Sequence, residues 1–143
     1  MGRFKQGYYE VQNPEKYVGN GKPMFRSSWE ANFMRTLDLH QAVLQWASEP
    51  IRIPYLNPVT GKGSMYVPDF LIKYMKSNGQ VVTELIEIKP ASQSLLERSK
   101  SKKDKIQLQI NAAKWEQAHK YCQRYNIKFR VLTEDQLFGK NKK

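Results

Sequence analysis

One strand near the middle of the chain carries two charges inside an apolar run. Residues 81–88 are the most β-branched of the predicted strands, and Pro90 ends the run because proline has no N–H to donate. Glu87 and Lys89 lie two residues apart, so their side chains should project from one face of the strand. Burying charges among apolar neighbours is costly unless something neutralises them. The sequence therefore predicts a buried strand with a polar site near its carboxyl end.

Three further strands are predicted around this segment from short alternating apolar runs, over 51–55, 65–74 and 127–132. The second of them is interrupted at Pro68. Ser77-Asn78-Gly79 is a strong turn signal and joins that strand to 81–88 as a hairpin. Residues 57–63 are also a turn by composition.

Two helices are predicted. Ser27-x-x-Glu30 is a capping-box pattern, so the first helix begins there and ends near His40, with a short further turn over 42–46. A second helix spans about 104–125, with one face expected to comprise Ile106, Ile110, Ala113, Gln117, Tyr121 and Tyr125, widened by Trp115 and Ala118. The element order indicates an α/β domain with a mixed sheet of about four strands flanked by helices.

The length of 143 residues fits one domain. We expect an arm over 1–25, a core domain over 26–138 and a basic tail over 139–143. The aromatic arm either wraps on the body or reaches along DNA or into a partner. No apolar run approaches a membrane span or a signal peptide, so we expect no membrane partner and a protein that stays in the cytoplasm where it is made.

Cys122 is the only cysteine, which excludes an internal disulfide and a cysteine-based zinc site. A nucleophilic role would need a histidine partner, and His119 lies one turn earlier on the predicted helix. A cysteine in an aromatic-rich helical segment is more often a packing residue, and we favour that interpretation.

The formal charge is +11, and it is unevenly spread: residues 1–90 carry 11 basic and 8 acidic side chains, whereas 91–143 carry 13 and 5. A basic surface of this kind attracts polyanions through counterion release. The candidate phosphate contacts are Arg98, Lys100, Lys102, Lys103, Lys105 and Lys114, although a merely solvated face would have the same composition.

Three acids can converge on the predicted site. Asp69 follows Pro68, and the hairpin should bring it opposite Glu87, while Glu30 approaches from the first helical turn. A divalent cation would neutralise these acids, and Mg²⁺ prefers carboxylate oxygens and suits phosphodiester hydrolysis. Lys89 can then hold or help deprotonate a water. The alternative for each residue is structural: a helix cap, a bend, or a Lys–Glu salt bridge.

Four blocks of the chain resemble the PD-(D/E)xK nucleases: Phe25-Arg26-Ser27-Ser28-Trp29-Glu30, Ser48-Glu49-Pro50, Tyr66-Val67-Pro68-Asp69-Phe70 and Ile86-Glu87-Ile88-Lys89-Pro90. The blocks are similar to those of the nuclease subunit of heteromeric transposases. Together with Gly-Tyr-Tyr and Asn-Pro-Glu-Lys-Tyr in the arm, they are similar to those of the head completion nucleases of T-even-type tailed phages. These blocks are specific as a set and weak singly.

The resemblance implies a restriction-endonuclease-like core, with Glu30, Asp69 and Glu87 as metal ligands and Lys89 as the catalytic lysine. Transposase relatives often carry Gln where Glu87 stands, so here the metal set is fully acidic. The resemblance also implies a Mg²⁺-dependent deoxyribonuclease, with Mn²⁺ able to substitute. Its partners would be double-stranded DNA and phage head, portal or neck proteins. It would act in the host cytoplasm during head completion and could be retained in the virion.

Two other functions stay open from the sequence. A structural head or neck protein could bind DNA through charge without catalysis. A junction resolvase or a transposon-end endonuclease would use the same acidic set. No base-reading motif is apparent, which suits contact with the DNA backbone in each case.

Overall fold

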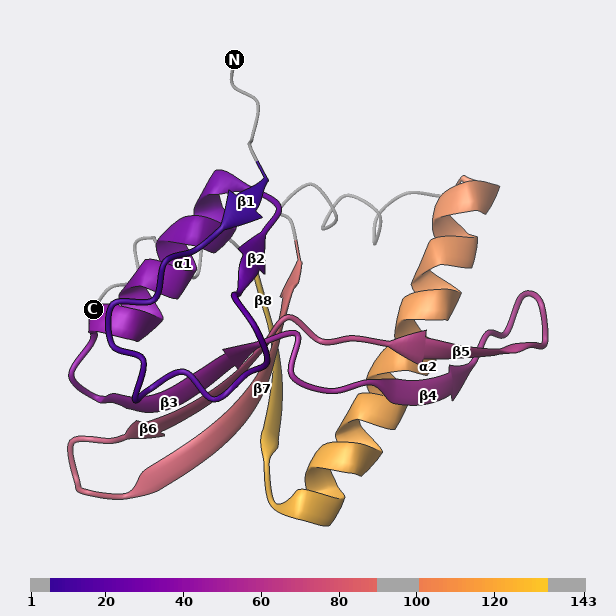
Figure 1. Cartoon of the computed structure of the whole chain (residues 1–143). Coiled ribbons are helices and arrows are strands. Elements are labelled where there is room, and N and C mark those ends of the chain that lie inside the picture. The colour runs from indigo at the N-terminus through magenta and orange to yellow at the C-terminus, as the bar shows by residue number, and fades with distance from the viewer. Residues whose placement is uncertain (1–5, 90–100, 134–143) are drawn as a thin grey trace.

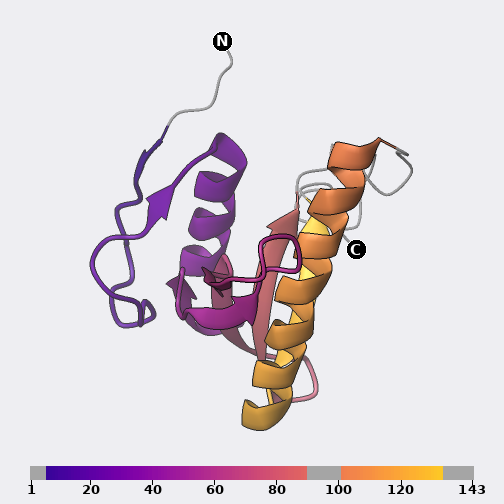
Figure 2. The same ribbon diagram turned by 90° about the vertical axis from the view of Figure 1, so that its right-hand side faces the viewer.

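Two helices lie on opposite faces of one sheet in the structure, a computed structural model that describes residues 6–89 and 101–133 (Figures 1 and 2). Helix α1 (Ser28–Leu39) begins at the predicted cap, where the Ser27 side chain accepts a hydrogen bond from the Glu30 N–H. Its apolar face is buried against the sheet through Phe33, Met34 and Leu37. Helix α2 (Lys102–Tyr125) covers the other face and is capped by Ser101.

The central sheet has four strands in the order β3 (Val43–Ser48), β6 (Phe70–Met75), β7 (Val81–Lys89) and β8 (Lys128–Thr133). The first three pair antiparallel, and β8 pairs parallel with β7 after the crossover through α2. The predicted α/β class with a mixed four-stranded sheet is confirmed, and so is the hairpin turn, where Gly79 has a φ of 87° that favours glycine.

Two of the predicted elements are wrong in detail. Of the turn predicted over 42–46, Ala42 does lie in a turn, whereas Val43 to Trp46 begin β3, which pairs with β6 from Val43 to Ser48. The strand predicted over 65–74 is two strands, because β5 (Gly63–Tyr66) pairs with β4 (Ile53–Leu56) in a separate hairpin and β6 starts only at Phe70. The break falls at Pro68, which is buried and cannot donate to a ladder.

Strand β7 separates two apolar clusters. Ile86 and Ile88 point toward α1 and pack with Phe33 and Trp46, whereas Leu85 points the other way and packs with Ala118 of α2. Because side chains alternate along a strand, Glu87 and Lys89 lie on the same face as Leu85. The predicted pair therefore faces α2 and the β4–β5 hairpin.

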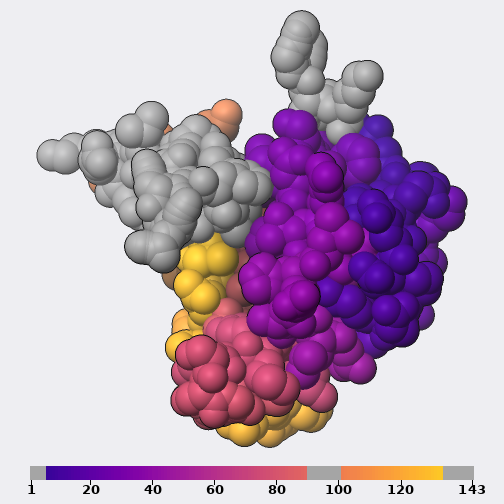
Figure 3. All heavy atoms as spheres, turned by 90° about the vertical axis from the view of Figure 1, so that its left-hand side faces the viewer, coloured from indigo at the N-terminus to yellow at the C-terminus, as the bar shows by residue number. Residues whose placement is uncertain are grey.

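The N-terminal arm is packed on the body over its described part (Figure 3). Strands β1 (Gly7–Tyr8) and β2 (Met24–Phe25) pair antiparallel, and the rings of Tyr9 and Tyr17 meet Trp46 edge-on. Buried Asp38 accepts hydrogen bonds from the Tyr9 hydroxyl at 2.7 Å and from two arm backbone N–H groups. The arm thus wraps on the body, while the domain limits at 25/26 and 138/139 stay a prediction and the predicted tail lies outside the described residues.

The buried face of α2 agrees with the predicted one in the middle of the helix and departs from it at the two ends. Ile110, Ala113, Trp115, Ala118 and Tyr121 belong to the cluster around Leu85, whereas Ile106 and Tyr125 are exposed. Asn111 and Cys122 are buried although they were not part of the predicted face. Burial raises the pKa of the Cys122 thiol to about 11, and the exposed His119 instead meets Phe129. These observations favour packing over nucleophilic chemistry for Cys122. No helix of the described residues is long and apolar enough to cross a membrane.

Candidate active site

Asp69 and Glu87 meet where β6 begins and β7 ends. The Asp69 N–H donates to the Ile86 carbonyl at 3.1 Å, and the Asp69 Oδ2 accepts from the Ile88 N–H at 2.7 Å. Glu87 Oε1 accepts a 2.7 Å hydrogen bond from the hydroxyl of Tyr66, a buried residue on β5. The ladder between β6 and β7 continues in register toward this point, so the two acids lie on neighbouring strands as the hairpin predicted.

Burial and mutual repulsion disfavour the charged form of both acids. Burial raises the pKa of Asp69 to about 8, and the nearby Glu87, Glu30 and Glu49 add to the rise. Burial likewise raises the pKa of Glu87, although the Tyr66 hydroxyl and the charge of Lys114 oppose it. Neither carboxylate forms an ion pair within the described residues. A cation placed between them would therefore be stabilised.

Glu30 lies near this pair but takes part in the helix cap. Its Oε1 accepts a 2.7 Å hydrogen bond from the Arg26 N–H, one residue earlier than the capping box predicts. Its charge nevertheless contributes to the raised pKa of Asp69 and of Glu87, so the three acids share one electrostatic environment. Among residues 6–89 and 101–133, no set of three His, Cys, Asp or Glu side chains is arranged to hold a metal ion. The arrangement thus brings two of the acids together and leaves Glu30 at the edge.

Helix α2 contributes the lysine Lys114 and the indole of Trp115 beside the two acids, next to Lys89 at the end of β7. The Lys89 ammonium lies 5.9 Å from the ring centre of Trp115. The Lys114 ammonium lies 6.0 Å from the ring of Tyr55 and 5.9 Å from the ring of Tyr66, and its charge lowers the pKa of Glu87. Such distances suit cation–π contacts, which hold a lysine head group in place without neutralising it.

Sequence reasoning gave too little weight to two neighbours of the site, Glu49 and Arg26. Glu49 has a φ of 48°, a left-handed conformation that is uncommon for a residue with a side chain. Its N–H donates to the Asp69 carbonyl at 2.8 Å, and its carboxylate pairs with Arg26. Both residues stand in the blocks that carried the family resemblance. An acid placed directly before Pro50 was the signal that could have identified Glu49.

The predicted phosphate contacts divide into three groups. Lys102, Lys103 and Lys105 are exposed on the first turns of α2. Lys114 is half-buried and lies at the site. Arg98 and Lys100 lie outside the described residues, so they remain predictions. Asp69, Glu87 and Lys114 therefore lie together, so this part of the protein can hold a cation beside a phosphate.

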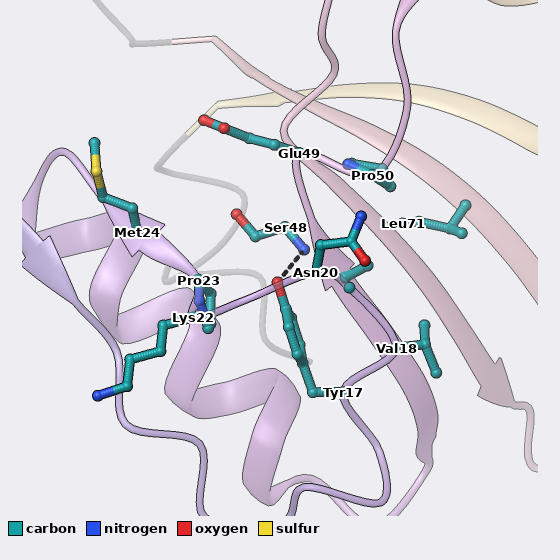
Figure 4. Close-up of a pocket in the computed structure, with 12 residues that line it drawn as sticks. Tyr17, Val18, Asn20, Lys22, Pro23, Met24, Ser48, Glu49, Pro50 and Leu71 are labelled. Carbon is teal, nitrogen blue, oxygen red and sulfur yellow. Dashed lines mark hydrogen bonds between the residues drawn. The ribbon is translucent and has the colours of Figure 1, made fainter.

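A cavity of about 240 Å³ lies beyond the site, between the arm and β3 (Figure 4). Tyr17 stands at its wall, and its hydroxyl accepts a hydrogen bond from the Ser48 N–H at 3.4 Å. Glu49 is among the lining residues, whereas Asp69 and Glu87 are not. The cavity therefore adjoins the acidic pair only through Glu49.

Two comparisons with known proteins bear on this geometry. A family model described as "TnsA-like endonuclease N terminal" matches residues 40–134, which include Asp69, Glu87, Lys89 and Lys114. The protein named "Head completion nuclease" from Enterobacteria phage T4 is 31% identical over 140 residues, covering 92% of this chain and 92% of the relative. The similarity therefore extends over the arm and Glu30 as well as the sheet.

Proposed function

The chain belongs to the family of TnsA-like endonucleases, and on that premise we propose that it is a divalent-metal-dependent deoxyribonuclease. Asp69, Glu87 and Glu30 would be the metal ligands, and Lys89 the catalytic lysine. The single observation that carries this assignment is the close approach of Asp69 and Glu87 without a cationic side chain in an ion pair with either. Two half-buried acids that repel each other are a poor structural contact but a suitable cation site.

Mg²⁺ is the ion we propose, with Mn²⁺ as a substitute, because the donors are carboxylate oxygens. The bound ion would polarise the scissile phosphate and lower the pKa of a water. The Tyr66 hydroxyl fixes the Glu87 carboxylate, and the Ile88 N–H fixes that of Asp69, so both are oriented before any ion arrives. Glu30 would leave the Arg26 N–H to complete the set. Lys89 on the same face of β7 can hold the attacking water or the phosphate.

DNA would bind along the α2 side of the site. Lys114 lies over two tyrosine rings and its charge acts on Glu87, and Lys102, Lys103 and Lys105 lie exposed farther along the same helix. Contacts of this kind bind phosphates without reading the base sequence. We therefore propose little sequence preference.

The biological role we propose is phage head completion, supported by the name of the T4 relative and by its match over almost the whole chain. The protein would act on DNA in the host cytoplasm during assembly, with head, portal or neck proteins as partners, and could be retained in the virion.

The direct test incubates the purified protein with linear and supercoiled plasmid in Mg²⁺, in Mn²⁺ and in EDTA. We expect cleavage in either metal, none in EDTA, and none with Asp69→Ala. Glu116→Gln is the matched control, because Glu116 is an exposed acid of α2 paired only with Lys120. DNA binding without cleavage under every condition would instead support a structural head or neck protein. A strong preference for four-way junctions would support a resolvase.

A further inference from the structure

The β4–β5 hairpin begins and ends beside the candidate site. It occupies the chain between Glu49 and Asp69, and the Glu49 N–H closes its base by donating to the Asp69 carbonyl at 2.8 Å. Tyr66, at the end of β5, donates to Glu87 at 2.7 Å. From this base the hairpin crosses α2 and extends past it (Figure 1). A DNA substrate bound at Asp69 and Glu87 would therefore lie next to the hairpin.

The two faces of the hairpin differ. Ile53, Tyr55 and Tyr66 point inward and pack in the cluster that includes Ala118 of α2. The opposite face is apolar too, although nothing in the described structure covers it: Leu56 is 63% exposed and Met65 is 55% exposed. Leu56 pairs with Gly63, and Met65 lies two residues farther along the same strand as Gly63. Leu56 and Met65 are therefore diagonal neighbours on one face of the hairpin. The hairpin thus presents an apolar patch that its own packing does not require.

The hairpin is also ordered and lacks acidic side chains. The turn after β4 is held by Asn57, whose side-chain oxygen accepts from the N–H groups of Val59 and Thr60 at 2.8 and 3.2 Å. Residues 51–67 contain no Asp or Glu, and their two charged residues, Arg52 and Lys62, are basic and exposed. An apolar surface bordered only by cations suits a polyanion that carries flat apolar groups, namely DNA with accessible bases.

We propose that this hairpin is a DNA-contacting arm of the nuclease whose outer face, centred on Leu56 and Met65, packs against unpaired bases beside the cleaved phosphate. The proposal rests on the proposed function and names its substrate class: DNA that is open at an end, flap or gap, rather than continuous duplex. Leu56 lies about 10 Å along the strands from Tyr66, which equals about three base steps. The contacted bases should therefore lie within that distance of the cleavage point.

The test measures DNA binding in EDTA, so it does not depend on cleavage. The full-length protein is titrated against a labelled duplex with a single-stranded overhang and against the same duplex sequence within a covalently closed, fully paired circle. A fluorescent adenine analogue in the overhang reports unstacking. The double variant Leu56→Ser/Met65→Ser should bind the open duplex about tenfold more weakly, since base contacts are lost, while its affinity for the closed duplex changes less than about twofold. The rise in analogue fluorescence should also disappear.

The matched control is Met75→Ser/Val81→Ser. These two residues are paired in the β6–β7 hairpin and are each 43% exposed, so the control removes a similar apolar surface at the far end of the sheet. We expect it to bind both DNAs as the unaltered protein does. Leu56→Phe, which enlarges the stacking surface, should retain or raise the affinity for the open duplex.

Three results would overturn the proposal: equal weakening on both DNAs, no weakening on either, or the same loss in the control. Unchanged DNA binding by the Leu56/Met65 variant together with loss of binding to a head or neck protein would assign the patch to a protein partner instead. The protein could also fail to cleave DNA and still bind open DNA more tightly than closed DNA. That result would reject the catalytic function and leave the hairpin proposal supported.

Discussion

Strand β7 carries two glutamates three residues apart, and their surroundings are opposite. Glu84 points toward β8 and β6, where Arg130 donates to one carboxylate oxygen at 3.1 Å and the Tyr74 hydroxyl to the other at 2.6 Å. Glu87 points toward α2, where it receives a hydrogen bond from Tyr66, feels the charge of Lys114 and raises the pKa of a second acid, Asp69. Glu84 is the more deeply buried of the two and is still the better compensated.

The difference separates an acid that serves the fold from one whose arrangement costs the fold stability. Burial alone does not mark a functional acid, because a buried carboxylate that has a guanidinium and a hydroxyl is a complete structural unit. A carboxylate held by one tyrosine beside a second acid is incomplete until a cation arrives. Variants on either side of β7 should therefore change different properties of the protein.

The largest effect is expected from Asp69→Asn. Removing one of the two proposed central ligands should lower metal-dependent cleavage about a thousandfold or more. The same change should leave the free energy of unfolding unchanged or raise it, because a repelling buried charge is lost. Cleavage rates at saturating Mg²⁺ and chemical denaturation in EDTA measure the two quantities. A variant that is inactive only because it is unfolded would contradict the assignment.

The pH dependence of stability should come from the Asp69 side of the strand. The pKa of Asp69 is about 8 in the folded protein against an ordinary value of 3.8 for an aspartate, so the folded state holds the proton more tightly. In EDTA, stability from this group is complete below pH 3.8 and is lost progressively as the pH rises toward about 8. Denaturation midpoints across this range should show the fall, and Asp69→Asn or added Mn²⁺ should flatten it. A rise in stability over the same range would refute the shift.

On the other side of β7, Arg130→Met should act on stability rather than on catalysis. It leaves Glu84 buried without its cation, which we expect to cost about 2 kcal/mol because Arg130 is partly exposed. The cleavage rate per folded molecule should stay within about twofold of the unaltered protein, a negligible change in barrier. If the folded Arg130→Met variant lost metal-dependent activity, the Glu84 face of β7 would be shown to affect the acidic pair on the other face.

Tyr66→Phe removes the hydroxyl that orients Glu87 and keeps the ring beneath Lys114. Loss of such an orienting hydrogen bond should slow cleavage about tenfold and weaken metal binding to a similar degree. Rates measured over a Mn²⁺ titration separate the two effects. An unchanged apparent metal affinity would show that the hydroxyl does not prepare the site.

The smallest effect is expected from Lys114→Met. It should weaken DNA binding a few-fold and lower the slope of log affinity against log salt by about one unit, as expected for one phosphate contact. Lys120→Met on the exposed, Glu116-paired part of α2 is the control and should change the slope less. Equal slopes for the two variants would remove Lys114 from the DNA contacts.

Much of the fold could be predicted because its signals are local. The Ser27 cap, the Asn78-Gly79 turn and the β-branched run of β7 each reflect a preference of a few adjacent residues. Strand β3 could not be predicted in the same way, because the short apolar run from Val43 suits a helix or a strand equally and only its pairing with β6 decides.

The acids of the candidate site could be predicted from the sequence, whereas the residues that position them could not. Asp69, Glu87 and Lys89 stood out as charges in apolar strands, and the structure brings the two acids together. Tyr66 and Glu49 were missed as site residues, since a tyrosine in a strand and an acid before proline have ordinary structural uses. Only the pairing of β4 with β5 and the closed base of the hairpin place them beside the acids.

The most direct test is a calorimetric titration of Mn²⁺ into the full-length protein and into Asp69→Asn, Glu87→Gln and Glu84→Gln. We expect saturable binding that is retained in Glu84→Gln and lost in the other two variants. Binding that survives both Asp69→Asn and Glu87→Gln in folded protein, or that disappears only in Glu84→Gln, would contradict this expectation.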